Sequence, residues 1–200
     1  MWTPAARRLA ALLTVAATAS PVAAHDRNRR DAPDRPSVPG NLEVDAAYAP
    51  YLRLHADGTQ NYLCVATATG VAWAFLGPQA TLFDGDADQV ATHYLSPNPI
   101  EGGTARATWR HSRDTSTVWA AAVETSSDAA YVAPGAIPWL KLKVMGAQLG
   151  PDGGRALARA TFIQRVNTAG GVAPATGCAT AANIGARVYV PYATDYVFYR

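Results

Sequence analysis

The feature that most constrains the fold is an alternation of apolar and polar side chains that recurs in short runs. In the clearest run, Leu140, Leu142 and Val144 alternate with Lys141 and Lys143. A period of two places successive side chains on opposite faces of a strand. The runs are separated by turn-forming residues about every 8–12 positions, which is typical of antiparallel sandwiches and barrels. We therefore predict an all-β fold, a single antiparallel sandwich or barrel-like domain of about nine short strands.

Local patterns predict the details of this sheet. The two lysines predict an edge strand, because lysine on an edge discourages pairing with another molecule. Asp57 and Gly58 lie between two alternating runs and predict a hairpin turn. Residues 155–166 are predicted to form one long strand, and a short helix is expected only within residues 126–133.

The N-terminus has the three regions of a secretory signal peptide. Arg7 and Arg8 precede an apolar run at residues 9–19, and small residues at 22–24 form a cleavage site. The apolar run is too short to span a membrane. We therefore predict that residues 1–24 are a signal peptide and that the protein is secreted, to the extracellular space or the cell envelope, with no transmembrane segment in the mature chain.

The rest of the chain is predicted to be a linker and one domain. Residues 25–41 mix opposite charges with three prolines and are predicted to be a flexible polar linker, which leaves residues 42–200 as a single β domain. The signal peptide holds two of the 17 basic residues and none of the 15 acidic ones, so the mature chain has 15 of each. This balance argues against the basic surface of nucleic-acid-binding proteins, and no nucleic-acid partner is expected.

The chain has two cysteines, Cys64 and Cys178. Two cysteines in an exported chain most simply form one disulfide. The alternatives are a metal pair or a catalytic thiol. Each of these needs a neighbouring ligand or base, and neither cysteine has a histidine or another cysteine within a few positions. The pattern therefore favours a disulfide.

Histidines are the first candidate ligands. His93 and His111 would form a metal pair if they lie on neighbouring strands, because imidazole is a favoured ligand of transition metals. The alternative is that both are hydrogen-bonded residues beside Tyr94 and Trp109. His25 would become the mature N-terminus and a copper ligand if cleavage follows residue 24, but its polar surroundings favour a frayed tail.

An acidic run provides a candidate calcium site. Asp84, Asp86 and Asp88 alternate like the opening of a calcium-binding loop. Gln89 and Leu95 stand where that loop has glycine and glutamate. The pattern favours a plain acidic turn between strands, with a weak surface calcium site as the alternative.

Arg165 is a candidate anion ligand. It precedes Gly170 and Gly171, whose backbone N–H groups would complete an anion site. The alternative, which the commoner use of glycine in turns favours, is that Arg165 pairs with a carboxylate or bonds to carbonyl groups while the glycines supply positive φ.

Several segments, taken together and in order, resemble a known family. They are GTQNYLC (58–64), AWAFLGPQATLFD (72–84), THY (92–94), IPWLKLKV (137–144), FIQRVNTAGGVAPATGC (162–178) and VPYATDYVFY (190–199). The chain resembles the domain-of-unknown-function family 3455 of exported bacterial and fungal proteins. The resemblance implies one secreted domain with two paired cysteines, and it implies no activity, cofactor or catalytic residue. The chain departs from the family at residues 94–103, YLSPNPIEGG, where a Gly-Pro-Thr-Trp run is more usual.

Motifs of the common enzyme classes are absent from the sequence. It has no GxSxG elbow, no HExxH pair and no strand–GxGxxG–helix unit. The leading hypothesis is therefore a binding or structural module without a cofactor. The alternatives are a secreted enzyme, metal-dependent through His93 and His111, and a carbohydrate-binding module that contacts glycans or the cell surface through exposed aromatic side chains.

Overall fold

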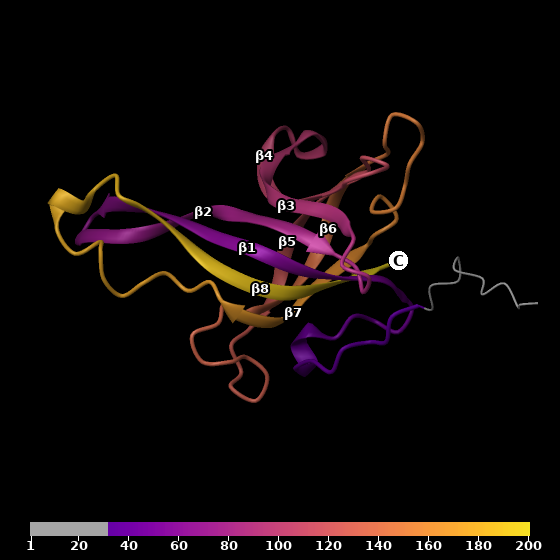
Figure 1. Ribbon diagram of the computed structural model, residues 1–200, viewed down its shortest axis with the longest axis horizontal. Coiled ribbons are helices and arrows are strands. Elements are labelled where there is room, and N and C mark those ends of the chain that lie inside the picture. Colours follow the sequence, from indigo (N-terminus) through magenta and orange to yellow (C-terminus); the bar gives the residue numbers. More distant parts are fainter. Residues whose placement is uncertain (1–31) are drawn as a thin grey trace, which may run out of the picture. The chain divides into compact units, whose positions relative to one another are not determined.

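The structure, a computed structural model, describes residues 32–200. The predicted signal peptide, His25 and the first part of the predicted linker lie outside the described residues. Within this range eight strands form a closed antiparallel barrel, in which each strand pairs with its sequence neighbours and β8 pairs with β1 (Figure 1). The strands are β1 (Pro50–Thr67), β2 (Gly70–Phe83), β3 (Gln89–Asn98), β4 (Thr104–His111), β5 (Thr117–Ser126), β6 (Trp139–Gln148), β7 (Phe162–Gly170) and β8 (Arg187–Tyr199).

Helix is almost absent from the described residues. The three helices there are 3-10 helices of three residues each: η1 (Gly40–Leu42), η2 (Pro99–Glu101) and η3 (Ala181–Asn183). In residues 32–200, no helix has the length and apolar character needed to cross a membrane. The prediction of an all-β fold is confirmed, in the form of a barrel.

β1 is a single long strand, and the hairpin predicted at Asp57 and Gly58 is wrong. Both residues lie in the middle of β1, where Gly58 pairs with Ala80 of β2. A Cβ atom on Gly58 would lie 2.1 Å from the carbonyl oxygen of Gln79, so the close approach of β2 requires glycine here. This one strand replaces two predicted ones, and the observed count of eight strands is close to the predicted count of about nine.

Two further local predictions are wrong. Residues 155–161 form turns, and β7 begins only at Phe162. Leu157 and Ala160 in this segment are buried in the barrel core, so their apolar character comes from packing and not from a strand. Residues 126–133 contain the end of β5 followed by turns, in place of the expected helix.

The lysines of β6 do not mark an edge strand. β6 pairs with β5 on one side and with β7 on the other, because barrel closure leaves it no free edge. Lys141 donates hydrogen bonds to the carbonyl oxygens of Asn41 and Glu43, at 2.7 and 3.2 Å. The alternating apolar residues of this strand pack against the barrel core, as predicted.

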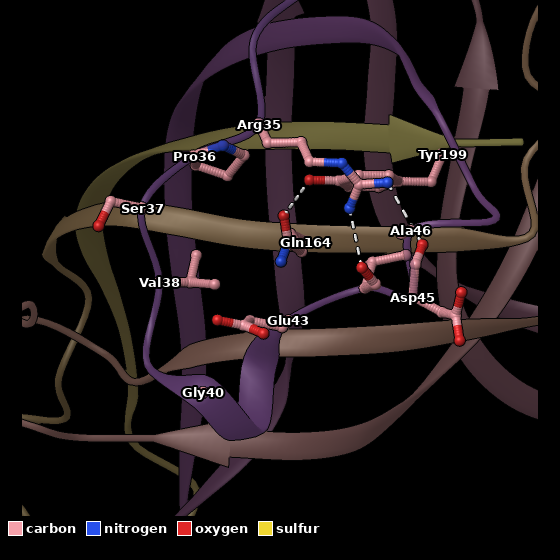
Figure 2. Close-up of a pocket in the computed structure, with 11 residues that line it drawn as sticks. Arg35, Pro36, Ser37, Val38, Gly40, Glu43, Asp45, Ala46, Gln164 and Tyr199 are labelled. Carbon is pink, nitrogen blue, oxygen red and sulfur yellow. Dashed lines mark hydrogen bonds between the residues drawn. The ribbon is translucent and has the colours of Figure 1, made fainter.

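A segment before β1, residues 35–48, crosses the outer face of the barrel and is called the strap below. Arg35 folds it back on itself by donating hydrogen bonds to the carbonyl oxygens of Val44 and Asp45 (Figure 2). It also donates to the carbonyl oxygen of Tyr48. Its apolar side chains form a second core with outward-facing residues of the barrel. The buried members are Leu42, Val44, Val132, Trp139, Val166, Val197 and Tyr199.

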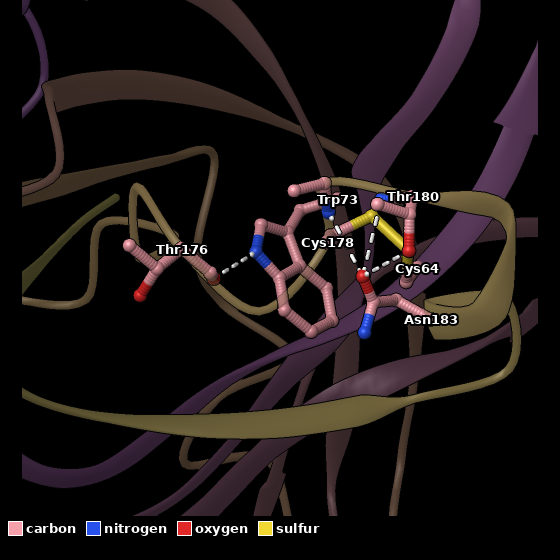
Figure 3. The surroundings of a disulfide bond; sticks show 7 residues. Cys64, Trp73, Thr176, Cys178, Thr180 and Asn183 are labelled. Atoms are coloured by element: carbon pink, nitrogen blue, oxygen red, sulfur yellow. Dashed lines mark hydrogen bonds between the residues drawn. A yellow bond between two sulfur atoms is a disulfide. The ribbon is translucent and has the colours of Figure 1, made fainter.

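β1, β2 and β8 run past the end of the barrel as a three-stranded ribbon (Figure 1). The predicted disulfide lies on this ribbon, where Cys64 and Cys178 are bonded with Cα atoms 5.5 Å apart (Figure 3). The backbone of Cys64 also pairs with Gly185 and Ala186. The disulfide therefore fastens the loop between β7 and β8 to the first strand of the chain.

Candidate functional site

A cavity of about 280 Å³ lies in the part of the barrel lumen that the core does not fill. Small side chains of β4 and β5, among them Ala105, Ala107, Ala120 and Ala122, line one side of it. Large side chains usually fill the inside of an eight-stranded barrel. Alanines at these positions leave space that a bound molecule can occupy.

The cavity reaches the surface between β2 and β3. These strands pair only from Ala80 toward the end of β2 and diverge before it. Phe75 and Leu95 line the cavity and are 50% and 37% exposed. A Cβ atom on Gly77 would lie 2.7 Å from the Leu95 side chain, so this glycine lets Leu95 rest on the backbone of β2. Leu95 therefore lies across the opening.

His93 of β3 is a buried, neutral histidine on the cavity wall. Its Nδ1 donates a 2.9 Å hydrogen bond to the carbonyl oxygen of Thr108, and its ring stacks on Trp109 with centroids 4.2 Å apart. Burial lowers the pKa of His93 to about 3, with a smaller lowering by the charge of Arg165, and the Thr108 bond only partly opposes this. Because Nδ1 carries the proton, Nε2 is the hydrogen-bond acceptor of the ring.

Three other groups that line the cavity are buried donors that form no well-aligned hydrogen bond within residues 32–200. They are the Gln60 amide Nε2, the Trp109 indole Nε1 and the Tyr196 hydroxyl. Their residues are at most 2% exposed. The Tyr192 hydroxyl also forms no well-aligned hydrogen bond in this part of the chain. It lies near the Gln60 amide and the Tyr196 hydroxyl, and the Tyr196 hydroxyl lies near the Arg165 guanidinium, but none of these approaches has the geometry of a full hydrogen bond.

Arg165 supplies positive charge at the cavity wall. Its Nε and Nη2 donate to the carbonyl oxygen of Pro138, at 3.2 and 2.7 Å. This is the carbonyl-bonding alternative of the sequence analysis. None of the described carboxylates lies within ion-pair distance of its guanidinium. The N–H of Gly171 donates to Pro191, and Gly170 and Gly171 have φ of 66° and 86°, so these glycines serve the chain reversal.

The structure places His93 and His111 on neighbouring strands but in different surroundings. His93 pairs with Trp109, whereas His111 pairs with Ala91. The Nδ1 of His111 accepts hydrogen bonds from the backbone N–H groups of Arg113 and Asp114. Within residues 32–200, no group of three or more His, Cys, Asp or Glu side chains is arranged to hold a metal ion.

The acidic run forms the turn between β2 and β3. Asp84 Oδ1 accepts hydrogen bonds from the backbone N–H groups of Asp86 and Asp88, at 3.0 and 3.1 Å. Asp88 lies 3.7 Å from the guanidinium of Arg113. The carboxylate of Asp84 thus organises the turn.

A second, more polar cavity of about 740 Å³ lies beneath the strap (Figure 2). Its main buried polar groups already have partners: the Tyr199 hydroxyl donates to Gln164 Oε1, and Gln164 Nε2 donates to the carbonyl oxygen of Leu42. This network holds the strap to the barrel. The lumen cavity, with its unpartnered donors, is the better candidate for a ligand site.

Sequence reasoning identified His93 and Arg165 but missed Gln60, Trp109 and Tyr196 as site residues. Gln60 had a recognisable signal: it falls on the inward, apolar side of the alternation in β1, where a polar side chain needs a buried partner. The Trp109 and Tyr196 side chains could not be separated from ordinary core aromatics by pattern alone.

The comparisons with known proteins bear on the family and not on the activity. No curated protein and no solved structure matches the chain. A family model matches residues 46–200, which are most of the chain and all eight strands. The chain therefore belongs to the family described as Protein of unknown function (DUF3455).

Proposed function

We propose that this domain is an exported binding module that holds a small, partly apolar molecule in the barrel lumen. The observation that carries the proposal is a cavity of about 280 Å³ lined by donors on Gln60, Trp109 and Tyr196 that form no well-aligned hydrogen bond with any of the described residues. Buried polar groups in folded proteins are nearly always bonded, and each one left without a partner costs about 1–3 kcal/mol. A bound molecule with acceptor atoms would remove this cost.

The chemistry of His93 favours binding over acid–base catalysis. A general base works best when its pKa lies near the working pH. The pKa of His93 is lowered to about 3 by burial, so the ring is a weak base at neutral pH. Its role in the proposal is to present a neutral aromatic wall together with Trp109.

Export is part of the proposal, and the disulfide supports it. Disulfides persist in oxidising compartments and are rare in the cytosol. The predicted signal peptide at residues 1–24 would deliver the chain to such a compartment. Fractionating cells that express the full chain tests this part: recovery of the processed, oxidised protein outside the cytoplasm supports export, and an unprocessed, reduced cytosolic protein contradicts it.

Binding is tested by titrating the mature protein with benzoate, benzamide and benzyl alcohol while amide chemical shifts are recorded by NMR. We expect at least one of these probes to shift resonances of lumen residues. Ala107→Leu narrows the lumen and should abolish the shifts, whereas the control Ala147→Leu, at an exposed site of β6, should leave them unchanged. If no probe binds, or if Ala107→Leu binds like the wild type, the lumen is not a ligand site.

A further inference from the structure

We propose that the lumen ligand is an anion, namely a small organic carboxylate whose carboxylate group faces Arg165 and whose apolar body lies against the alanine wall. This inference rests on the proposed function. It specifies the charge and polarity of the ligand, which the cavity and its donors alone leave open.

The first step is the charge balance of the cavity wall. Two cationic side chains line it, Arg106 and Arg165. Arg106 is neutralised by Glu101, to which its Nε and Nη2 donate at 2.9 and 2.7 Å. Arg165 donates hydrogen bonds to the neutral carbonyl group of Pro138 and lies beside the Tyr196 hydroxyl. Neither group is a carboxylate, so the charge of Arg165 has no anionic counterpart within residues 32–200. Buried or partly buried charges are normally paired.

The second step is that the neighbouring titratable groups cannot supply a negative charge. Burial raises the pKa of Tyr192 and of Tyr196, so both hydroxyls stay protonated and act as donors. Burial also raises the pKa of Tyr62, a third tyrosine that interacts electrostatically with Arg165, so its hydroxyl stays protonated as well. The side chain of His93 is neutral at physiological pH. The compensating charge must therefore come from a molecule in the lumen or from solvent.

The third step concerns hydrogen bonding. Within residues 32–200, the groups on Gln60, Trp109 and Tyr196 that form no well-aligned hydrogen bond are an N–H₂, an N–H and an O–H, and each of them can donate. A carboxylate has two oxygens that only accept hydrogen bonds, and its bonds to a guanidinium are charge-assisted. A monoanion fits better than a phosphate, because one unpaired arginine does not balance two negative charges.

The fourth step concerns the remainder of the ligand. Besides its polar groups, the cavity is lined by Leu140, which pairs with Arg165 across β6 and β7, by Leu142, and by the alanines of β4 and β5. Its volume of about 280 Å³ is just below the range of about 300–1,000 Å³ that holds drug-sized ligands. The ligand therefore has a compact apolar body, such as one ring or a short branched chain.

The test compares benzoate with benzamide, its neutral analogue of the same shape, by titration calorimetry of the mature protein at pH 7. Charge-assisted hydrogen bonds contribute about 1.5–3 kcal/mol, so we expect benzoate to bind at least about tenfold more tightly. Arg165→Met should remove this preference. The control Arg110→Met, at an exposed position of β4, should keep it.

The outcomes separate the two proposals. If both probes bind equally to the wild type, the anion inference is overturned while the binding function stands. If neither binds, the proposed function itself fails. Should Arg165→Met not fold, the preference for benzoate and its weakening between low and high salt in the wild type decide the matter, because Arg165 is only partly buried and a partly exposed ion pair is screened by salt. A salt-independent affinity equal to that of benzamide contradicts the inference.

Discussion

The buried imidazole of His93 predicts a specific loss of stability in acid. Its folded-state pKa is lowered to about 3, mainly by burial, whereas an unperturbed histidine has a pKa of about 6.5. Below pH 6.5 the unfolded chain therefore takes up a proton at this site that the folded protein does not. Stability rises with pH wherever the unfolded state binds more protons, so the contribution of His93 is fully present above pH 6.5 and decreases as the pH falls toward 3.

The size of this effect follows from the two pKa values. Each pH unit between them changes the free energy of unfolding by about 1.4 kcal/mol. From pH 6.5 to pH 4 the loss is therefore about 3 kcal/mol, a large part of the roughly 5–15 kcal/mol that stabilises a typical domain.

Urea unfolding at pH 7, 6, 5 and 4 measures the effect in the wild type and in His93→Asn. Asparagine keeps an N–H₂ that can bond to the carbonyl oxygen of Thr108 but does not titrate. The variant should be less stable at pH 7, because the stack on Trp109 is lost. The difference between the two proteins should shrink by about 3 kcal/mol by pH 4. Parallel stability curves over this pH range would refute the reasoning.

Three further predictions concern the frame of the barrel and its opening. Replacing Cys64 and Cys178 by alanine removes a covalent bond between residues 114 positions apart, which in the chain-entropy model stabilises the protein by about 5 kcal/mol. We therefore expect thermal denaturation to show a Tm lower by about 10–20 °C. A decrease of less than about 2 °C would contradict this. Gly58→Ala should lower the free energy of unfolding measured with urea by about 1–3 kcal/mol, because the added Cβ atom would overlap the backbone of β2. In the control Gly85→Ala, the added Cβ atom has no neighbouring atom within 4 Å. Equal stability of the two variants would disprove the packing argument. Leu95→Ala should raise the association and dissociation rates of benzoate by about tenfold in stopped-flow measurements. This corresponds to a free-energy barrier to passage that is lower by about 1.4 kcal/mol. Unchanged rates would show that the ligand enters elsewhere.

The all-β fold was predictable because it depends on local patterns. Leu140, Leu142 and Val144 alternate with lysines whether or not the neighbouring strands are known, and the structure places these apolar residues toward the core. The disulfide was predictable for a different reason: two cysteines in a chain with a predicted export signal have few other uses.

The errors have a common physical cause. Asp57 and Gly58 have the composition of a turn, but contact with the backbone of Gln79 places Gly58 inside a strand. The lysines of β6 are typical of an edge strand, but closure of the barrel gives β6 a neighbouring strand on each side. In both cases a contact distant in sequence overrode a local preference.

The candidate site was predictable only in part. His93 and Arg165 were recognised one by one as residues able to bind a ligand. Their convergence with Gln60 and Tyr196 depends on strand register: Arg165 pairs with Tyr196 across β7 and β8, and Gln60 lies two strands away on β1. No local sequence pattern specifies the register between strands that are so distant in the chain.

The sequence by itself determined the class of fold, the pairing of the two cysteines and the residues able to carry charge or accept protons. Each of these follows from side-chain chemistry and short-range periodicity. The tertiary structure alone decided that β8 closes on β1, that alanines leave part of the lumen unfilled, and that Arg165 faces this space with no carboxylate of residues 32–200 as its partner. Closure and packing are set by contacts between residues more than a hundred positions apart, as Leu54 and Tyr196 illustrate. Such contacts exist only once the whole chain has folded.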